Sequence, residues 1–160
     1  TSAERIPYGA IRGGYVYNFW QDEAHERGIW RRVPVAEYAK ASPAWETLLD
    51  VDALSAEGGA NWVYKGVQCL PPEQTDCLLS LSNGGKDAVR VREYSIAGGG
   101  VKAGFVEGGF DIPEAKSNFV WANSSRRMLF SLFQWISASM PRTARFMRQR
   151  RHVVWLRSCP

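Results

Sequence analysis

Short runs of alternating apolar and polar residues, separated by turns, form the dominant pattern of the chain. Leu79 and Leu81 alternate with serines, and Val89 and Val91 alternate with arginines. Alternation with a period of two is typical of half-buried antiparallel strands. The 15 glycines and eight prolines favour many short strands and turns over a few long helices. We therefore expect an all-β fold.

An aromatic hairpin lies near the start of the chain. The expected strand, residues 15–20, reads Tyr-Val-Tyr-Asn-Phe-Trp, and a charged loop at residues 21–27 leads into a second strand that begins at Gly28 and Ile29. Side chains alternate between the faces of a strand, so both faces of residues 15–20 are largely apolar. We expect this strand to be packed between layers.

The strands group into units of four. In the first unit we expect strands at residues 5–12, 15–20, from 28 onward and at 45–54, a short helical insert at 34–42 and a linker at 55–60. In the second unit we expect strands at residues 61–69, 77–82, 88–96 and near 101–106, and a third unit opens with strands at 117–121 and 128–133. Four-stranded units at this interval predict the antiparallel blades of a β-propeller, about two to three of them. A β-sandwich with similar strand counts remains an alternative.

Charge is distributed unevenly along the chain. Residues 1–114 hold all 16 acidic residues and 11 basic ones, a net charge of −5, whereas residues 115–160 hold nine basic residues and no acidic one, a net charge of +9. No apolar run approaches the roughly 18 residues of a membrane span, so we expect no membrane-spanning segment, and the first residues do not resemble a secretory signal, although a start at Thr1 is not informative about targeting. The spacing of Cys69, Cys77 and Cys159 fits neither a metal site nor a disulfide framework, which predicts reduced thiols and a cytoplasmic location.

Five segments resemble one enzyme family in order and in register. They are residues 17–22 (YNFWQD), 27–32 (RGIWRR), 45–54 (WETLLDVDAL), 80–88 (SLSNGGKDA) and 108–117 (GGFDIPEAKS). Over residues 5–121 the chain resembles the opening blades of the seven-bladed N-terminal propeller of the prolyl oligopeptidase family, in its bacterial branch. The resemblance implies a serine endopeptidase in which an α/β-hydrolase domain carries Ser, Asp and His and the propeller restricts entry to short proline-containing peptides. It also implies that the catalytic segment follows the blades and is absent here.

The residues present carry no recognisable catalytic constellation of their own. No serine has glycine at both positions of a Gly-x-Ser-x-Gly nucleophile elbow. His25 is expected to be an exposed loop residue, and neither it nor His152 belongs to a pattern with a nucleophile and an acid. His25-Glu26 lacks the second histidine of a zinc helix, and residues 98–104 fit no phosphate-binding loop. We expect no catalytic residue, no metal and no cofactor, and we assign no substrate-binding residue.

Four arginines on the expected strands could attract peptide carboxylates: Arg31, Arg32, Arg90 and Arg92. Arginines that alternate with apolar residues more often form the solvated face of a sheet. We therefore expect these side chains to be solvated.

The resemblance to the family weakens after Trp121. We therefore divide the chain into propeller blades at residues 1–121 and a basic tail at residues 122–160. Three readings of the tail stay open: an out-of-frame or truncated ending, a divergent third blade, and a basic arm for nucleic acid or membrane, the least favoured.

We expect a propeller fragment that is inactive alone, whose partners are the catalytic domain, short peptides and further copies through open blade edges. Membrane and nucleic-acid partners are not expected. The alternative is a stand-alone β-rich binding module with a basic tail that contacts an acidic partner.

Overall fold

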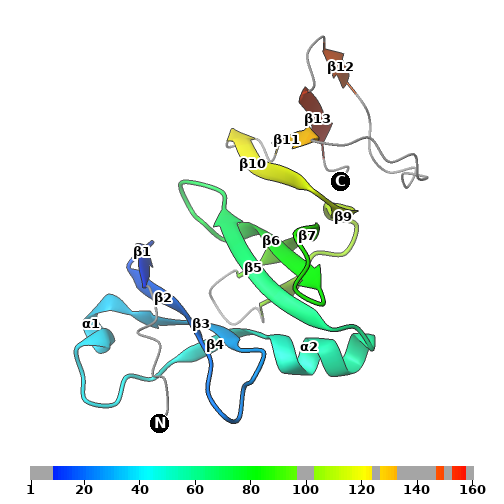
Figure 1. Cartoon of the computed structure of the whole chain (residues 1–160). Helices are drawn as coiled ribbons and strands as arrows, with labels where there is room; N and C mark the ends of the chain where they lie inside the picture. Colours follow the sequence, from blue (N-terminus) through cyan, green and yellow to red (C-terminus); the bar gives the residue numbers. More distant parts are fainter. Residues whose placement is uncertain (1–8, 97–102, 124–126, 133–146, 150–152, 158–160) are drawn as a thin grey trace. The chain divides into compact units, whose positions relative to one another are not determined.

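The computed structural model describes residues 9–96, 103–123, 127–132, 147–149 and 153–157. Antiparallel β-sheets dominate this part of the chain, with a few short helical segments (Figure 1), as the sequence predicted. The chain divides into two compact units between Tyr64 and Lys65. Within the described ranges, no helix has the length and apolar character needed to cross a membrane.

The first sheet is a four-stranded meander in the order β1-β2-β3-β4. Its strands are β1 (Ala10–Arg12), β2 (Tyr15–Trp20), β3 (Ile29–Pro34) and β4 (Glu46–Asp50). Residues 5–8 of the expected first strand lie outside the described residues. Val16 and Val33, a paired couple, are buried on one face, and Tyr17 stacks on Trp30 on the other. Both faces of β2 therefore bury apolar side chains, as expected for a strand packed between layers.

Two helices interrupt the first unit. The short insert predicted at residues 34–42 is α1 (Val35–Tyr38). The extended strand predicted at residues 45–54 is wrong from Val51 onward, because α2 (Val51–Gly58) begins there and replaces both the strand's end and the linker. The Asp50 side chain caps this helix by accepting a hydrogen bond from the Ala53 N–H, and Gly59, with φ of 59°, ends it.

The second sheet contains β5 (Trp62–Cys69), β6 (Asp76–Asn83), β7 (Val89–Ser95), β8 (Gly104–Phe105) and β9 (Asp111–Ala115). The first three strands were predicted to within two residues. Of the fourth strand expected near residues 101–106, the described residues contain the two-residue β8, and β9 pairs with the rest of β7. The outer position of this sheet is thus shared by two short strands.

The third sheet begins with β10 (Ser117–Asn123) and β11 (Arg127–Leu132), close to the two strands predicted there. It continues with β12 (Met147–Gln149) and β13 (Val153–Arg157) in the order β10-β11-β13-β12. The tail therefore contributes strands to a sheet with β10. Its order differs from the meander of the first sheet, because β13 lies between β11 and β12.

An apolar cluster joins the second sheet to β10. Its buried members are Leu70, Leu78, Val91, Phe110, Phe119 and Trp121. The indole N–H of Trp121 donates a hydrogen bond of 3.0 Å to the Gln68 carbonyl, so the ring's polar atom is satisfied where its apolar surface is buried.

Candidate functional site

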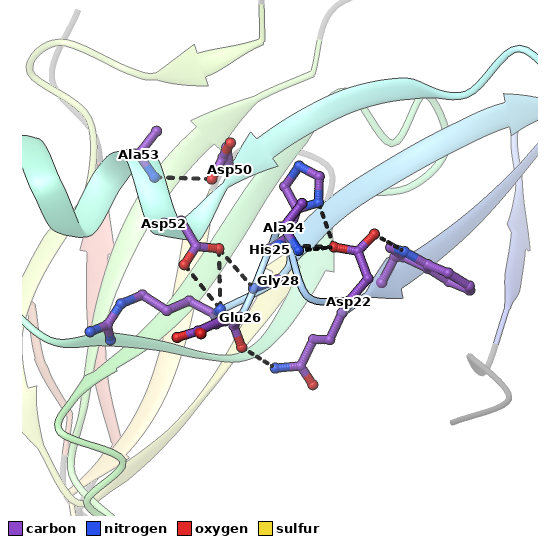
Figure 2. A network of polar contacts seen from close by, with 11 residues as sticks. Asp22, Ala24, His25, Glu26, Gly28, Asp50, Asp52 and Ala53 are labelled. Carbon is purple, nitrogen blue, oxygen red and sulfur yellow. Dashed lines mark hydrogen bonds and ion pairs between the residues drawn. The ribbon is translucent and has the colours of Figure 1, made fainter. Parts of the chain in front are cut away.

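The charged loop between β2 and β3 folds around the carboxylate of Asp22 (Figure 2). One carboxylate oxygen accepts hydrogen bonds from the backbone N–H groups of Ala24 (3.0 Å) and His25 (2.8 Å) and lies 2.8 Å from His25 Nδ1. The other accepts from the Trp20 indole N–H at 2.8 Å. The hydrogen bonds from Trp20 and then His25 lower the pKa of Asp22 from 3.8 to about 2. Asp22 is therefore an anion that organises the loop.

A second carboxylate attaches the end of this loop to α2. The Asp52 side chain accepts hydrogen bonds from the N–H groups of Arg27 and Gly28 (Figure 2). The Val51 N–H also donates to the Gly28 carbonyl. Gly28 has a φ of 95°, and a Cβ there would lie 2.5 Å from the Phe19 ring. Glycine is required at this position for both its conformation and its space.

The hydrogen bonds of this loop organise structure without assembling a hydrolytic centre. His25, expected to be exposed, is half-buried and contacts Asp22, as an orienting acid–base pair would. Among the described residues no third side chain orients this pair, and no group of them could hold a metal ion. His152 and most of the glycine run from residue 98 lie outside the described residues.

Arg31 is held between two indole rings. Its guanidinium carbon lies 4.4 Å from the centroid of the Trp20 ring and 4.3 Å from that of the Trp45 ring. Its Nε donates a hydrogen bond of 2.9 Å to Asn18 Oδ1. Burial lowers the pKa of Arg31, and the charge of Asp22 acts in the opposite direction.

Arg32 is buried, which contradicts the expected solvated position. It forms a two-pronged ion pair with Glu46, with Nε to Oε2 at 2.7 Å and Nη2 to Oε1 at 3.2 Å. Its guanidinium also lies over the Tyr15 ring. Burial lowers the pKa of Arg32, but the hydrogen bonds to Glu46 and Tyr17 outweigh burial and raise it.

Arg90 and Arg92 are half-buried and share Asp111. Arg90 binds both carboxylate oxygens at 2.7 Å each, and Arg92 Nε lies 3.6 Å from Oδ2. The Arg92 guanidinium also lies over the Phe105 ring. These two arginines are therefore engaged by an acidic partner in the same sheet and do not form a freely solvated face.

Cys69 and Cys77 form a disulfide, so the prediction of reduced thiols is wrong for this pair. They lie at the end of β5 and near the start of β6, neighbouring strands that a turn at residues 70–75 brings together. A separation of eight residues is no motif by itself, and only the hairpin makes the two positions adjacent. The thiols of this pair consequently give no support to a reducing compartment.

Known proteins share this sequence and fold. The family model described as "Prolyl oligopeptidase, N-terminal beta-propeller domain" matches residues 2–150. The chain is 47% identical over 114 residues to "Uncharacterized peptidase y4nA" of Sinorhizobium fredii, covering 71% of this chain and 15% of that protein. It is 43% identical over 104 residues to "Uncharacterized peptidase RP174" of Rickettsia prowazekii, covering 65% of this chain and 14% of that protein.

A solved structure matches the fold directly. The "Post-proline cleaving enzyme from Rickettsia typhi" is similar over 82% of this chain and 20% of its own, with a TM-score of 0.72 and 37% sequence identity. The chain thus spans only a small part of the length of these relatives. Together with the family model, this similarity shows that the chain belongs to the prolyl oligopeptidase family and forms part of its N-terminal β-propeller domain.

Proposed function

We propose that this chain forms the opening blades of a propeller that admits short proline-containing peptides to a Ser-Asp-His catalytic domain. The observation that carries this proposal is the family match across residues 2–150. The similarity to a post-proline cleaving enzyme, with antiparallel sheets in order along the chain, supports it. The division at residue 121, where we place the end of the well-matched blades, stays part of the proposal.

We further propose that the chain has no peptidase activity alone. Support comes from the sequence, which has no Gly-x-Ser-x-Gly elbow, and from the Asp22–His25 pair, whose contacts serve the loop. The test is incubation of the purified chain with a chromogenic Gly-Pro substrate, with and without a serine-directed inhibitor. Turnover that the inhibitor abolishes would overturn this proposal, and absence of turnover is expected.

Gating requires a separate test in an intact enzyme. The chain would replace the matching segment of the Sinorhizobium protein, and cleavage of a short peptide would be compared with cleavage of the same sequence inside a folded protein. We expect only the short peptide to be cleaved, as in the unaltered protein used as control. Equal cleavage of both substrates by the exchanged protein, while the control still cleaves only the short peptide, would show that this chain does not support gating.

A binding module with a basic tail is the second candidate, favoured by the net charge of +9 on residues 115–160. Salt-sensitive binding to duplex DNA or anionic vesicles that is lost on deletion of residues 141–160 would support it. No binding at low salt would remove it. A cytoplasmic location is also proposed, and cell fractionation tests it.

A further inference from the structure

Arg31 differs from Arg32, Arg90 and Arg92 because it has no acidic partner among the described residues. Arg32 binds Glu46, and Arg90 and Arg92 share Asp111. Among the residues that the structure describes, Arg31 forms no ion pair, and its one hydrogen bond runs from Nε to Asn18. A guanidinium carries five N–H donors. The Nη1 and Nη2 end of Arg31 is thus left without a protein acceptor in this part of the chain.

The surrounding residues hold that end of the side chain in place. Asn18 is the β2 partner of Arg31, and Thr47 is its β4 partner. Because side chains two residues apart share a face, Trp20 and Trp45 are on the same face as Arg31, and its guanidinium lies over both rings. With the guanidinium against two indole rings and Nε bonded to Asn18, the Nη1–Nη2 edge is the part that has no acceptor among the described residues.

The nearest described charge, Asp22, is not a permanent internal partner for the Nη1 and Nη2 atoms of Arg31. Asp22 acts on Arg31 through its charge, but its two oxygens already accept hydrogen bonds from Trp20, Ala24 and His25. Among the described residues no ion pair or hydrogen bond joins it to Arg31, so it is not the missing fork partner. Its negative charge opposes a second anion, so we expect affinity in the millimolar range.

We propose that Arg31, fixed between Trp20 and Trp45, is a binding site for a carboxylate group, held end-on by its Nη1 and Nη2 atoms. The fork geometry of a guanidinium matches a carboxylate, and this protein already fills the edge of Arg90 with the carboxylate of Asp111 at 2.7 Å for both bonds. The ligand carboxylate comes from a peptide C-terminus or from an acidic side chain. This inference goes beyond the gating role and does not depend on it.

The test is a titration of the full chain, labelled with ¹⁵N, at constant ionic strength. N-acetylalanine supplies a terminal carboxylate, N-acetylglutamic acid α-amide supplies a side-chain carboxylate, and N-acetylalanine amide supplies neither. We expect the Arg31 Nε–H signal and the Trp20 and Trp45 indole signals to shift and saturate with either acid and to stay in place with the amide. Stronger binding of one acid identifies the source.

Two variants separate a binding site from a structural stack. Arg31→Lys removes the planar fork, and we expect at least about tenfold weaker binding. Arg90→Lys is the matched control, because its arginine is already occupied by Asp111, and its binding should equal that of the unaltered chain. If Arg31→Lys does not fold, Trp45→Leu is tested instead. It removes one of the two rings that contact Arg31, at a half-buried position, and should weaken binding. Equal shifts with acid and amide, or full binding by the folded variant tested, would overturn the proposal.

Discussion

The first and second sheets each carry two arginines on an interior strand, and the spacing of the pair decides what each side chain meets. Arg31 and Arg32 are consecutive, so they lie on opposite faces of β3 and have separate partners, the two tryptophans and Glu46. Arg90 and Arg92 are two residues apart, share a face of β7 and share one carboxylate. An odd spacing thus divides a pair of charges between two environments, whereas an even spacing concentrates them on one.

The hairpins of the two sheets are also secured by different means. The loop between β2 and β3 is held by the carboxylates of Asp22 and Asp52 and by a glycine with positive φ. The hairpin of β5 and β6 is joined by the Cys69–Cys77 disulfide. One hairpin therefore depends on hydrogen bonds that acid can weaken, and the other depends on a covalent bond that a reductant can break.

The largest expected effect comes from removing the disulfide. Because the bond closes a loop with a sequence separation of eight, Cys69→Ala with Cys77→Ala should lower the free energy of unfolding by about 2 kcal/mol. Urea denaturation measures the loss, and reductant should lower the stability of the parent but leave the double variant unchanged. Alkylation of the unreduced protein should label Cys159 alone. Labelling of all three cysteines would contradict the disulfide.

Gly28→Ala should break the first hairpin by a purely steric route. The new Cβ would lie 2.5 Å from the Phe19 ring, and the alanine would have to keep a φ of 95°. We expect the substitution to lower the free energy of unfolding by about 2 kcal/mol. Gly13→Ala is the matched control, since Gly13 also has positive φ but nothing lies within 4 Å of its Cβ position. That variant should lose only about 1 kcal/mol. Equal losses in denaturation midpoints would show that the Phe19 contact has no effect.

Much of the fold could be predicted from the sequence, and the reasons for the failures are local. The alternation of apolar and polar residues located β6 and β7, because their sequences show the period of two directly. The helix α2 was missed because its eight residues are defined by a cap at Asp50 and a stop at Gly59 more than by periodicity. The segment's apolar residues suit a strand equally well.

Partnerships between distant residues could not be predicted from spacing. The register that brings Asp111 to Arg90 depends on a fourth strand displaced from its expected position to residues 111–115. One of the two rings that contact Arg31 comes from Trp45, in the segment before β4. The surroundings of Arg31 therefore could not be inferred from the Arg31–Arg32 pair alone. The family resemblance, by contrast, depended only on short sequence segments that match in the same order, and the family model confirmed it.

The two kinds of arginine pairing can be compared by removing charge from their acceptors. Glu46→Gln should cost about 1 kcal/mol because Arg32 is buried, whereas Asp111→Asn should cost about 0.5 kcal/mol because water reaches Arg90 and Arg92. Glu37→Gln, in an exposed pair with Lys40, is the control and should change stability by less than either. A greater loss for Asp111→Asn in urea denaturation would reverse the comparison.

The smallest expected effect concerns the pH response of the first hairpin. Hydrogen bonds from Trp20 and then His25 lower the pKa of Asp22 from 3.8 to about 2, so the contribution of this carboxylate is present above the unfolded pKa near 4 and is lost as the pH falls through about 2. Carboxyl ¹³C NMR should follow this titration. Trp20→Phe removes the indole N–H but keeps a ring, and it should raise the pKa more than His25→Ala does, because the indole bond has the larger effect. A pKa of Asp22 that Trp20→Phe leaves unchanged would show that the loop is organised by its backbone N–H groups, and the hairpin would then tolerate loss of the indole without loss of its acid resistance.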